Sequence, residues 1–369
     1  MRILQVSADR GVPLDGTKGA SVHVRSMARA FRRQGHNVRL VMANLGEDEA
    51  TVKALSAQVL KPGSLIDQAA RGGVADLVYE RYALGHLEGL ETAVTLGAPF
   101  VLEVNAPLVL EASRHRQATV RDGDEDVERR LFRSADLVVA VSEPLRKYIA
   151  EIRGTDHGTV VVRNGCDARA FDSAAPLQSG PPQRLVFLGH PKPWHGAEDL
   201  PRLVADLRRR GWDVDLLLIG AGAGADAVAS RARDLGVGDH VEVTGALSPE
   251  AAIRRLHEGT VAVAPYPPQG LYYFCPLKVI ECMAAGLPVV TTAQGDLPEV
   301  VGDAGLLVPP GDQRALLQAV ELLLRNEPLR RGLGARGRER ALSSFTWDHA
   351  ADHVLRAVAE IGGVGQRVA

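Results

Sequence analysis

The sequence predicts an α/β protein made of two doubly wound domains of similar size. The chain has 369 residues, which is too many for one compact core and typical of about two domains. Short apolar segments alternate with amphipathic ones, as expected for βαβ units with a parallel sheet and helices on both faces. The alternation stops once near the middle of the chain and then begins again, which places a domain boundary there.

Residues 1–172 contain the elements of the first domain. A strand is expected at 2–8, followed by a polar loop and a helix that begins at about Ser21, a possible N-cap. One face of this helix is apolar and is formed by Val24, Met27, Ala28 and Phe31. Further strands are expected at 36–43, 76–82, 99–105 and 136–142. Helical segments separate them, so we expect one parallel sheet.

Residues 173–183, rich in Pro, Ser and Gly, are expected to be a linker, and residues 184–345 a second domain. Six more strands are expected in that domain, at 184–189, 214–220, 240–245, 260–266, 288–292 and 304–310. An amphipathic helix within 346–369 is expected to pack back toward the first domain. Ligands of open α/β sheets bind outside the carboxyl ends of the strands, so two such domains facing each other predict a central cleft.

Composition argues against several classes of protein. A net charge of −2 gives no reason to expect a nucleic-acid partner. No apolar run reaches the ~18 residues of a spanning helix, and the start of the chain does not resemble a signal peptide, so we expect a cytoplasmic protein. The three cysteines lack CxxC spacing and predict neither disulfides nor zinc. A basic helix face could touch an anionic membrane, although such faces are usually solvated: Arg25, Arg29, Arg32 and Arg33.

Two motifs suggest other functions. Gly220, Gly222 and Ala225 fit a dinucleotide-binding fingerprint with Glu242 as its acid, which would indicate an NAD-dependent oxidoreductase. Glu242, however, lies inside an expected strand, whereas the fingerprint requires the acid at a strand end. Asp213 and Asp215 form a D-x-D pair, but they begin a strand at the edge opposite the ligand edge. We therefore predict no metal site and no bound cofactor.

Leu271–Val290 contains the most informative pair of charges. A turn at Pro276 precedes an apolar helix whose first N–H groups lack partners and attract anions. Lys278 lies in its first turn, where a cation is disfavoured unless it faces an anion such as a phosphate. Glu281, three residues on, could accept hydrogen bonds from a ribose diol. The alternative is an internal Lys278–Glu281 ion pair.

The loop after the first strand of the second domain contains Gly189, Lys192 and His195. A site for a diphosphate needs donors at a strand end, and this loop supplies two. The alternative for His195 is simple packing under Trp194. In the first domain, Gly19 would allow close approach of a ligand, and polar residues follow the strands. They are Arg81, Tyr82, Glu103, Asn105 and Glu111.

Together these segments resemble the retaining glycosyltransferases of family four, which have the GT-B fold. The resemblance extends over nearly the whole chain and includes "KGASVHVRSMARAFRRQGHNV", "VLEVNAPL", "VVVRNGCD", "GHPKPWHG", "HVEVTGAL", "YYFCPLKVIECMAAGLPVV", "EVVGDAGLLVPPGD" and the closing "FTW". The resemblance implies an N-terminal acceptor-binding domain, a C-terminal nucleotide-sugar-binding domain, and transfer of a sugar from a nucleotide diphosphate with retention of anomeric configuration.

The resemblance also implies roles for matched positions. Catalytic contributions are implied for Lys278, His195, Lys192 and Asn105, the last standing where many members have a histidine. Donor binding is implied for Gly19, Gly189, Asn164, Tyr273, Pro276, Leu277 and Glu281. Glu281 is the second glutamate of the family's E-x7-E motif, and Tyr273 replaces the first. Acceptor-side positions are Arg81, Glu103 and Glu111.

The implied mechanism needs no metal, and the departing diphosphate takes the proton of the acceptor. The acceptor is expected to be a small molecule, a lipid or a glycan precursor. Tyr273 and Asn105 depart from the family pattern, so a non-catalytic nucleotide-sugar-binding subunit is the alternative function, and an oxidoreductase is a weaker one.

Overall fold

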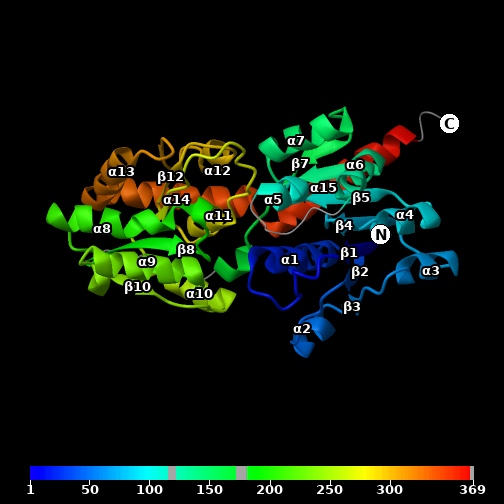
Figure 1. Cartoon of the computed structure of the whole chain (residues 1–369), viewed down its shortest axis with the longest axis horizontal. Helices are drawn as coiled ribbons and strands as arrows, with labels where there is room; N and C mark the ends of the chain where they lie inside the picture. The colour runs from blue at the N-terminus through cyan, green and yellow to red at the C-terminus, as the bar shows by residue number, and fades with distance from the viewer. Residues whose placement is uncertain (115–121, 172–179, 181, 366–369) are drawn as a thin grey trace. The chain divides into compact units, whose positions relative to one another are not determined.

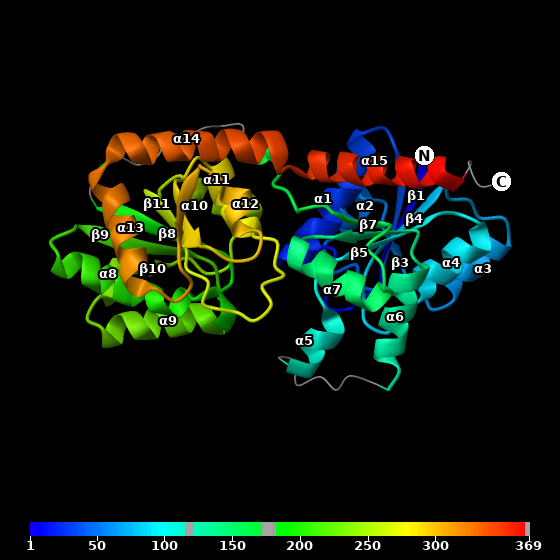
Figure 2. The ribbon, with the colours of Figure 1, turned by 90° about the horizontal axis from the view of Figure 1, so that it is seen from above.

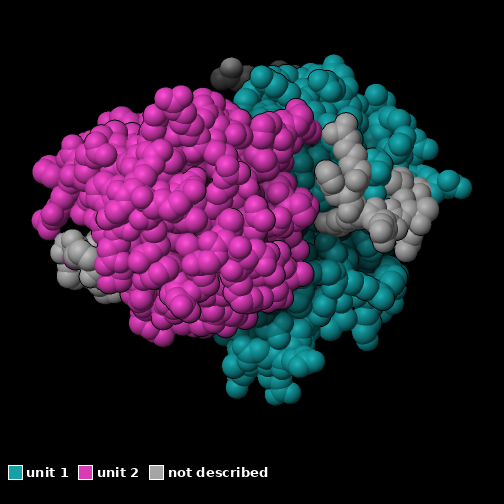
Figure 3. Space-filling model, turned by 60° about the vertical axis from the view of Figure 1, so that its left-hand side comes forward, with its two compact units in different colours: residues 1–164, 273–275, 347–369 teal, residues 165–272, 276–346 magenta. Residues whose placement is uncertain are grey.

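The computed structural model describes residues 1–114, 122–171, 180 and 182–365 (Figure 1). It divides into two compact units, coloured separately in Figure 3. Unit 1 comprises residues 1–164, 273–275 and 347–369, and unit 2 comprises residues 165–272 and 276–346. Most of the expected linker lies outside the described residues.

Unit 1 is built on a seven-stranded parallel sheet of order β3-β2-β1-β4-β5-β6-β7. Its strands are β1 (Arg2–Ser7), β2 (Asn37–Met42), β3 (Gln58–Val59), β4 (Leu77–Arg81), β5 (Phe100–Val104), β6 (Leu137–Ala140) and β7 (Thr159–Val161). Its helices are α1 (Gly19–Arg33), α2 (Glu49–Ala54), α3 (Ser64–Ala70), α4 (Glu88–Leu96), α5 (Leu108–Arg114), α6 (Asp124–Ser134), α7 (Glu143–Arg153) and α15 (Trp347–Gly365). The central strands are apolar and buried, as expected for a sheet covered on both faces.

Unit 2 is built on a six-stranded parallel sheet of order β10-β9-β8-β11-β12-β13. Its strands are β8 (Gln183–Leu188), β9 (Val214–Ile219), β10 (Val241–Val243), β11 (Val261–Ala264), β12 (Val289–Thr292) and β13 (Gly305–Val308). Its helices are α8 (Leu200–Arg209), α9 (Ala223–Asp234), α10 (Pro249–Leu256), α11 (Leu277–Ala284), α12 (Leu297–Val301), α13 (Gln313–Arg325) and α14 (Glu327–Ser344). Figure 2 shows helices on both faces of this sheet.

The doubly wound architecture predicted from the alternating pattern is confirmed in both units. Details differ at the edges. The short edge strands β3 and β7 were not predicted from the sequence. Helix α1 begins at Gly19, and its N-cap is Lys18 without a side-chain cap, so the proposed cap at Ser21 is wrong. Ser21 lies inside the helix and is buried.

Helix α15 completes unit 1. Trp347 at its start meets the His23 ring edge-on, with centroids 4.9 Å apart. Arg33 of α1 pairs with Asp348 at 2.6 Å. Within the described residues, no helix combines the length and the apolar character needed to cross a membrane.

The basic face of α1 does not support the idea of a membrane contact. The Arg25 guanidinium donates to the Gly16 carbonyl at 2.8 Å. Arg32 donates to the carbonyls of Val38 at 2.8 Å and Leu55 at 2.7 Å. With Arg33 bound to Asp348, three of the four arginines satisfy groups of unit 1 itself. These cations bind backbone carbonyls and a neighbouring helix instead of forming a free cationic face.

Candidate active site

Lys278 lies in the first turn of α11, directly after the N-cap Pro276 and Leu277. Its Nζ is 4.6 Å from the centroid of the Phe187 ring and 5.6 Å from that of Tyr266. Phe187 lies at the end of β8 and Tyr266 follows β11, the neighbouring strand. The carboxyl ends of two adjacent parallel strands therefore form an aromatic surface under this ammonium group.

The Lys278 ammonium is buried and has no hydrogen-bond partner within the described part of the chain. Burial lowers the pKa of Lys278 to about 7, with Cys282 and Glu281 acting in the opposite direction. Burial raises the pKa of Glu281 to about 7, and Lys278 acts against that rise. Among the described residues no ion pair joins the two side chains, so the internal pair allowed by their spacing is not formed. A buried cation without a partner is costly for the protein alone.

The backbone of Gly189 runs beside this cation. Gly189 has φ +101°, and a Cβ at this position would lie 3.8 Å from Lys278 Cε and 4.0 Å from Nζ. Its N–H donates to the Ile219 carbonyl at 2.8 Å, which fixes the loop to the end of β9. A side chain here would be strained and would fill the space in front of the ammonium. The structure thus brings Gly189 and Lys278 together.

His195 closes a short 3-10 turn, Pro193–His195. Its Nδ1 accepts from the Lys192 backbone N–H at 3.1 Å. The ring centroid lies 6.0 Å from that of Tyr266, which places His195 on the same aromatic surface. Burial and the nearby Lys278 lower the pKa of His195 to about 3, so the ring is uncharged at neutral pH. It can contribute as a neutral hydrogen-bonding group and not as a second cation.

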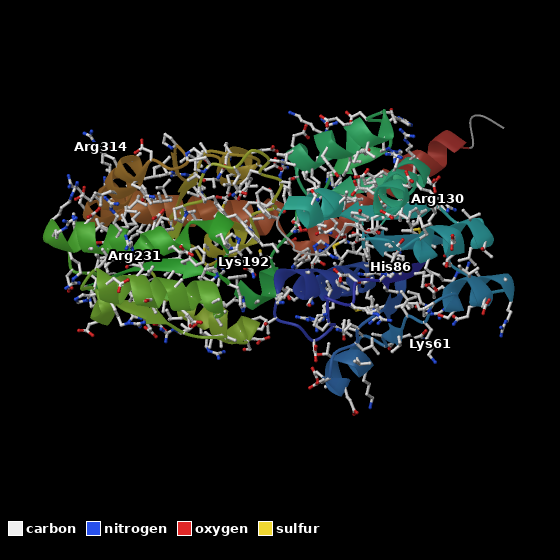
Figure 4. The ribbon with its side chains drawn as sticks, viewed as in Figure 1. Lys61, His86, Arg130, Lys192, Arg231 and Arg314 are labelled. Atoms are coloured by element: carbon white, nitrogen blue, oxygen red, sulfur yellow. The ribbon has the colours of Figure 1, made fainter. Side chains whose placement is uncertain are left out.

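Lys192 lies on the same loop and is exposed. Its side chain is labelled on unit 2 in Figure 4. The aromatic members of this site, Phe187 and Tyr266, were not predicted from the sequence. Aromatic residues are only 4% of the chain, so two of them near the ends of expected strands could have indicated that both line the ligand-binding edge of the sheet.

In unit 1 the predicted residues gather around Glu103, near the end of β5. His23 Nε2 lies 2.8 Å from its carboxylate, and Arg81 Nη1 lies 3.4 Å from it. The hydroxyl of Tyr79 and the amide Nδ2 of Asn105 also donate to it. Burial alone would raise the pKa of Glu103, but His23, Arg81 and Tyr79 outweigh it and lower the pKa to about 2. The carboxylate is ionised and its hydrogen bonds are internal to the unit.

The segment 273–275 also belongs to unit 1. The Tyr273 hydroxyl donates to Glu111 of α5, and the Tyr273 carbonyl accepts from Ser142 Oγ at 2.6 Å. The Asn164 N–H donates to Cys275 Sγ at 3.2 Å. The Asn164 side-chain oxygen is buried without a partner among the described residues. Gly19 is the exposed first residue of α1. Tyr273 therefore uses its hydroxyl to hold the Glu111 carboxylate of α5, at the position where the family resemblance implies a glutamate.

Comparison with known proteins identifies the family. A model described as Glycosyltransferase Family 4 matches residues 17–170, and one described as Glycosyl transferases group 1 matches residues 182–326. The chain belongs to the family-four glycosyltransferases. The first match covers strands β2 to β7 of unit 1, and the second covers strands β8 to β13 of unit 2. Each unit therefore has its own counterpart in the family.

Relatives and solved structures agree with this assignment. An MMP alpha-(1->4)-mannosyltransferase of Mycolicibacterium hassiacum is 29% identical over 297 residues, covering 77% of this chain and 70% of the relative. A phosphatidyl-myo-inositol mannosyltransferase of Mycobacterium leprae is 27% identical over 371 residues, covering 95% of each. A glycosyltransferase from Rickettsia africae has the same fold, with a TM-score of 0.76, 16% identity and 98% coverage of each chain. The fold is GT-B, and the protein is a glycosyltransferase that uses a nucleotide-sugar donor.

The glycine-rich turn of this glycosyltransferase has a packing role. A Cβ at Gly220 would lie 2.3 Å from the Gly189 carbonyl oxygen, and one at Gly224 would lie 2.5 Å from that of Pro191. The glycines let the Gly189 loop pass close to the start of α9. Glu242, the acid needed by a dinucleotide fingerprint, instead pairs with Arg255 and with Arg184. This arrangement argues against NAD binding.

The D-x-D pair is likewise held by side chains of the protein, and Arg208 lies near both carboxylates. Asp213 lies 3.2 Å from Arg208 Nη1, and Asp215 lies 3.0 Å from His240 Nδ1. No cluster of three His, Cys, Asp or Glu side chains suited to a metal occurs within the described ranges. Asp213 and Asp215 are therefore explained by ion pairs at the amino end of β9.

Proposed function

We propose that this glycosyltransferase transfers a hexosyl group from a nucleotide diphosphate to an acceptor hydroxyl, with retention at the anomeric carbon and without a metal ion. Unit 2 binds the donor. Unit 1 binds the acceptor and contacts the transferred sugar. The relatives named above, a phosphatidylinositol and an MMP mannosyltransferase, suggest a mannosyl donor and a polyol, lipid or glycan acceptor.

The observation that supports donor binding is the buried, unpartnered ammonium of Lys278. An anionic diphosphate beside it would supply the missing partner and raise the pKa of Lys278 from about 7. Gly189 leaves space for a phosphate oxygen beside Lys278 Nζ. The first N–H groups of an α-helix have no partner within the helix, so the start of α11 favours the same anion.

Charge develops on the diphosphate as the anomeric C–O bond breaks. Lys278, the exposed Lys192 and the start of α11 stabilise that charge as preorganised groups. The acceptor oxygen forms a new bond to the anomeric carbon on the face that the diphosphate leaves, and its proton passes to a diphosphate oxygen. Glu281 accepts hydrogen bonds from the ribose hydroxyls once its carboxyl is ionised, and His195 acts as a neutral group beside Lys278.

A donor screen tests this function. The purified protein is mixed with GDP-mannose, UDP-glucose and NAD, and its melting temperature is recorded. We expect a nucleotide sugar to raise the melting temperature and NAD to leave it unchanged. Stabilisation by NAD alone would overturn the proposal.

The second step measures chemistry with the stabilising donor and a panel of polyol, lipid and glycan acceptors. The proton–proton coupling at the anomeric carbon of the product reports the configuration. We expect the configuration of the donor to be kept, and an inverted product would reject retention. Donor binding with neither transfer nor donor hydrolysis would favour the non-catalytic subunit.

A further inference from the structure

Asn105 follows β5 at the carboxyl end of the unit 1 sheet, the edge where open α/β sheets bind ligands. Its Nδ2 donates to Glu103 Oε1. The two ends of an asparagine amide differ chemically, since the NH2 group donates and the oxygen accepts. An ionised carboxylate can only accept, so it must face the NH2 group of the amide.

We propose that Glu103 is a positioning residue that fixes the amide of Asn105, so that Asn105 offers its carbonyl oxygen to a hydroxyl group of the substrate. This inference rests on the proposed function, because it states which end of the Asn105 amide faces the transferred sugar. A sugar or polyol hydroxyl can donate to such an oxygen. A group that is only an acceptor, such as a ring or glycosidic oxygen, cannot.

Glu103 is suited to this task because its own orientation is fixed. It is 2% exposed. Its carboxylate receives His23 of α1 at 2.8 Å and the hydroxyl of Tyr79 from β4. Arg81 of β4 approaches Oε1, the same oxygen that accepts from Asn105, at 3.4 Å. With donors from two other elements, the carboxylate has no freedom to turn. Because the hydrogen-bond network is buried, any polar group in it that lost its partner would cost free energy, and this favours a single set of hydrogen bonds.

A second buried carboxylate in unit 1 provides a matched control. Glu128 of α6 is 3% exposed and accepts from the hydroxyls of Tyr82 and Tyr148, each at 2.7 Å. It resembles Glu103 in burial and in accepting from tyrosine, although burial raises the pKa of Glu128, and no bond to Asn105 is present among the described contacts. A general effect of losing a buried carboxylate should therefore appear in Glu128→Gln as well as in Glu103→Gln.

The kinetic test compares Glu103→Gln, Asn105→His, Asn105→Leu and the control Glu128→Gln at saturating donor. A glutamine amide both donates and accepts, so Glu103→Gln allows Asn105 to adopt either orientation. We expect kcat to fall about ten-fold or more in Glu103→Gln and in Asn105→Leu. Asn105→His should keep kcat within a few-fold, because a neutral imidazole donates with one nitrogen and accepts with the other. Glu128→Gln should melt lower with kcat unchanged.

Hydrogen exchange of the Asn105 amide, followed by NMR, tests the positioning without measuring enzyme activity. In protein labelled with 15N-asparagine, the Asn105 side-chain NH2 resonances are assigned by their loss in Asn105→His. We expect these protons to exchange slowly with water in the wild type and quickly in Glu103→Gln. If Glu103→Gln does not fold, Tyr79→Phe is used, with Tyr82→Phe as its control, and a smaller loss of protection is expected.

The outcomes separate the two proposals. If the wild type turns over no donor, the proposed function fails and the exchange measurement alone judges the positioning. Rapid exchange of the NH2 protons in the wild type overturns the positioning role. It is also overturned if the enzyme is active and Glu103→Gln keeps normal kcat, or if Glu128→Gln loses as much kcat as Glu103→Gln.

Discussion

Glu103 in unit 1 and Lys278 in unit 2 are both buried charged groups near the carboxyl ends of parallel strands. They differ in their hydrogen bonds to the rest of the protein. Glu103 accepts from four side chains, those of His23, Tyr79, Arg81 and Asn105. Lys278 Nζ meets aromatic rings and has no hydrogen-bond partner among the described residues. Since an unpaired buried charge is expensive, the partnered group is explained by the fold and the unpartnered one by a ligand.

The largest effect is expected on stability, when Glu103 loses one of its hydrogen-bond partners. His23→Ala leaves the Glu103 carboxylate without its 2.8 Å partner and removes the ring that packs on Trp347. Breaking a buried pair from one side typically costs ~3–5 kcal/mol of stability. Urea unfolding at pH 7 measures the loss. A free energy of unfolding within ~0.5 kcal/mol of wild type, the range of an ordinary surface substitution, would mean that Glu103 is not held by its partners.

Lys278→Ala tests the unpartnered charge. Losing one preorganised donor at a developing anion typically costs ~10²–10³ in rate, so transfer should fall by that factor. Stability should not fall in parallel, because among the described residues the ammonium has no hydrogen-bond partner to lose. The measurements are kcat and melting temperature of one purified variant, with Lys61→Ala as an exposed control. A lower melting temperature with normal turnover would assign Lys278 to structure.

Glu281→Gln should weaken nucleotide binding by a smaller factor. Hydrogen bonds to a charged group contribute about 1.5–3 kcal/mol, so the affinity for the nucleoside diphosphate should fall roughly ten-fold or more. Titration calorimetry measures it. Unchanged affinity in a folded variant would reject the contact with ribose. Glu281 would then act only by raising the pKa of Lys278.

The two regions should also differ in how pH affects stability. Glu103 has its pKa lowered to about 2, so the stability it contributes is present above about pH 4.5 and is lost as pH falls toward 2. Glu281 has its pKa raised to about 7, so stability is lost as pH rises from about 4.5 to 7. In urea unfolding between pH 5 and 7, wild type should lose stability relative to Glu281→Gln as pH rises, because His195, whose lowered pKa has the opposite effect, is present in both proteins. Parallel curves for the two proteins would contradict the raised pKa.

The smallest effect is expected from removing metals. Asp213 and Asp215 are paired with Arg208 and His240, and the proposed charge stabilisation uses Lys278. Transfer in EDTA should therefore equal transfer without it. Activity that disappears in EDTA and returns with Mg²⁺ or Mn²⁺ would shift the stabilisation of the diphosphate from lysine to a metal.

Much of the fold could be predicted because apolar periodicity records which residues face a core. The long central strands and the amphipathic helices gave strong patterns, and both sheets followed from them. The edge strands β3 (Gln58–Val59) and β7 (Thr159–Val161) were missed, since strands of two and three residues leave no periodicity to detect. The start of α1 was misplaced because its N-cap, Lys18, offers no side-chain signal.

The candidate site was predictable in part. Gly189, His195 and Lys278 were identified from their places after a strand or at a helix start, and they lie together around Phe187 and Tyr266 in unit 2. Their charge states were not predictable. Desolvation depends on every neighbour in space, and it makes His195 neutral and brings the pKa of Lys278 to about 7.

The sequence by itself determined the architecture and the family, because periodicity and short motifs are local properties of a chain. Tertiary structure alone decided which charged groups have partners. His23 and Glu103 are 80 positions apart, and nothing near either one indicates the other. Lys278 and Glu281 are three positions apart, and no ion pair joins them within the part of the chain that the structure describes, although spacing on a helix allows a pair. Pairing of buried charges depends on the direction of each side chain within a packed interior, and that direction is set only when the whole unit has folded.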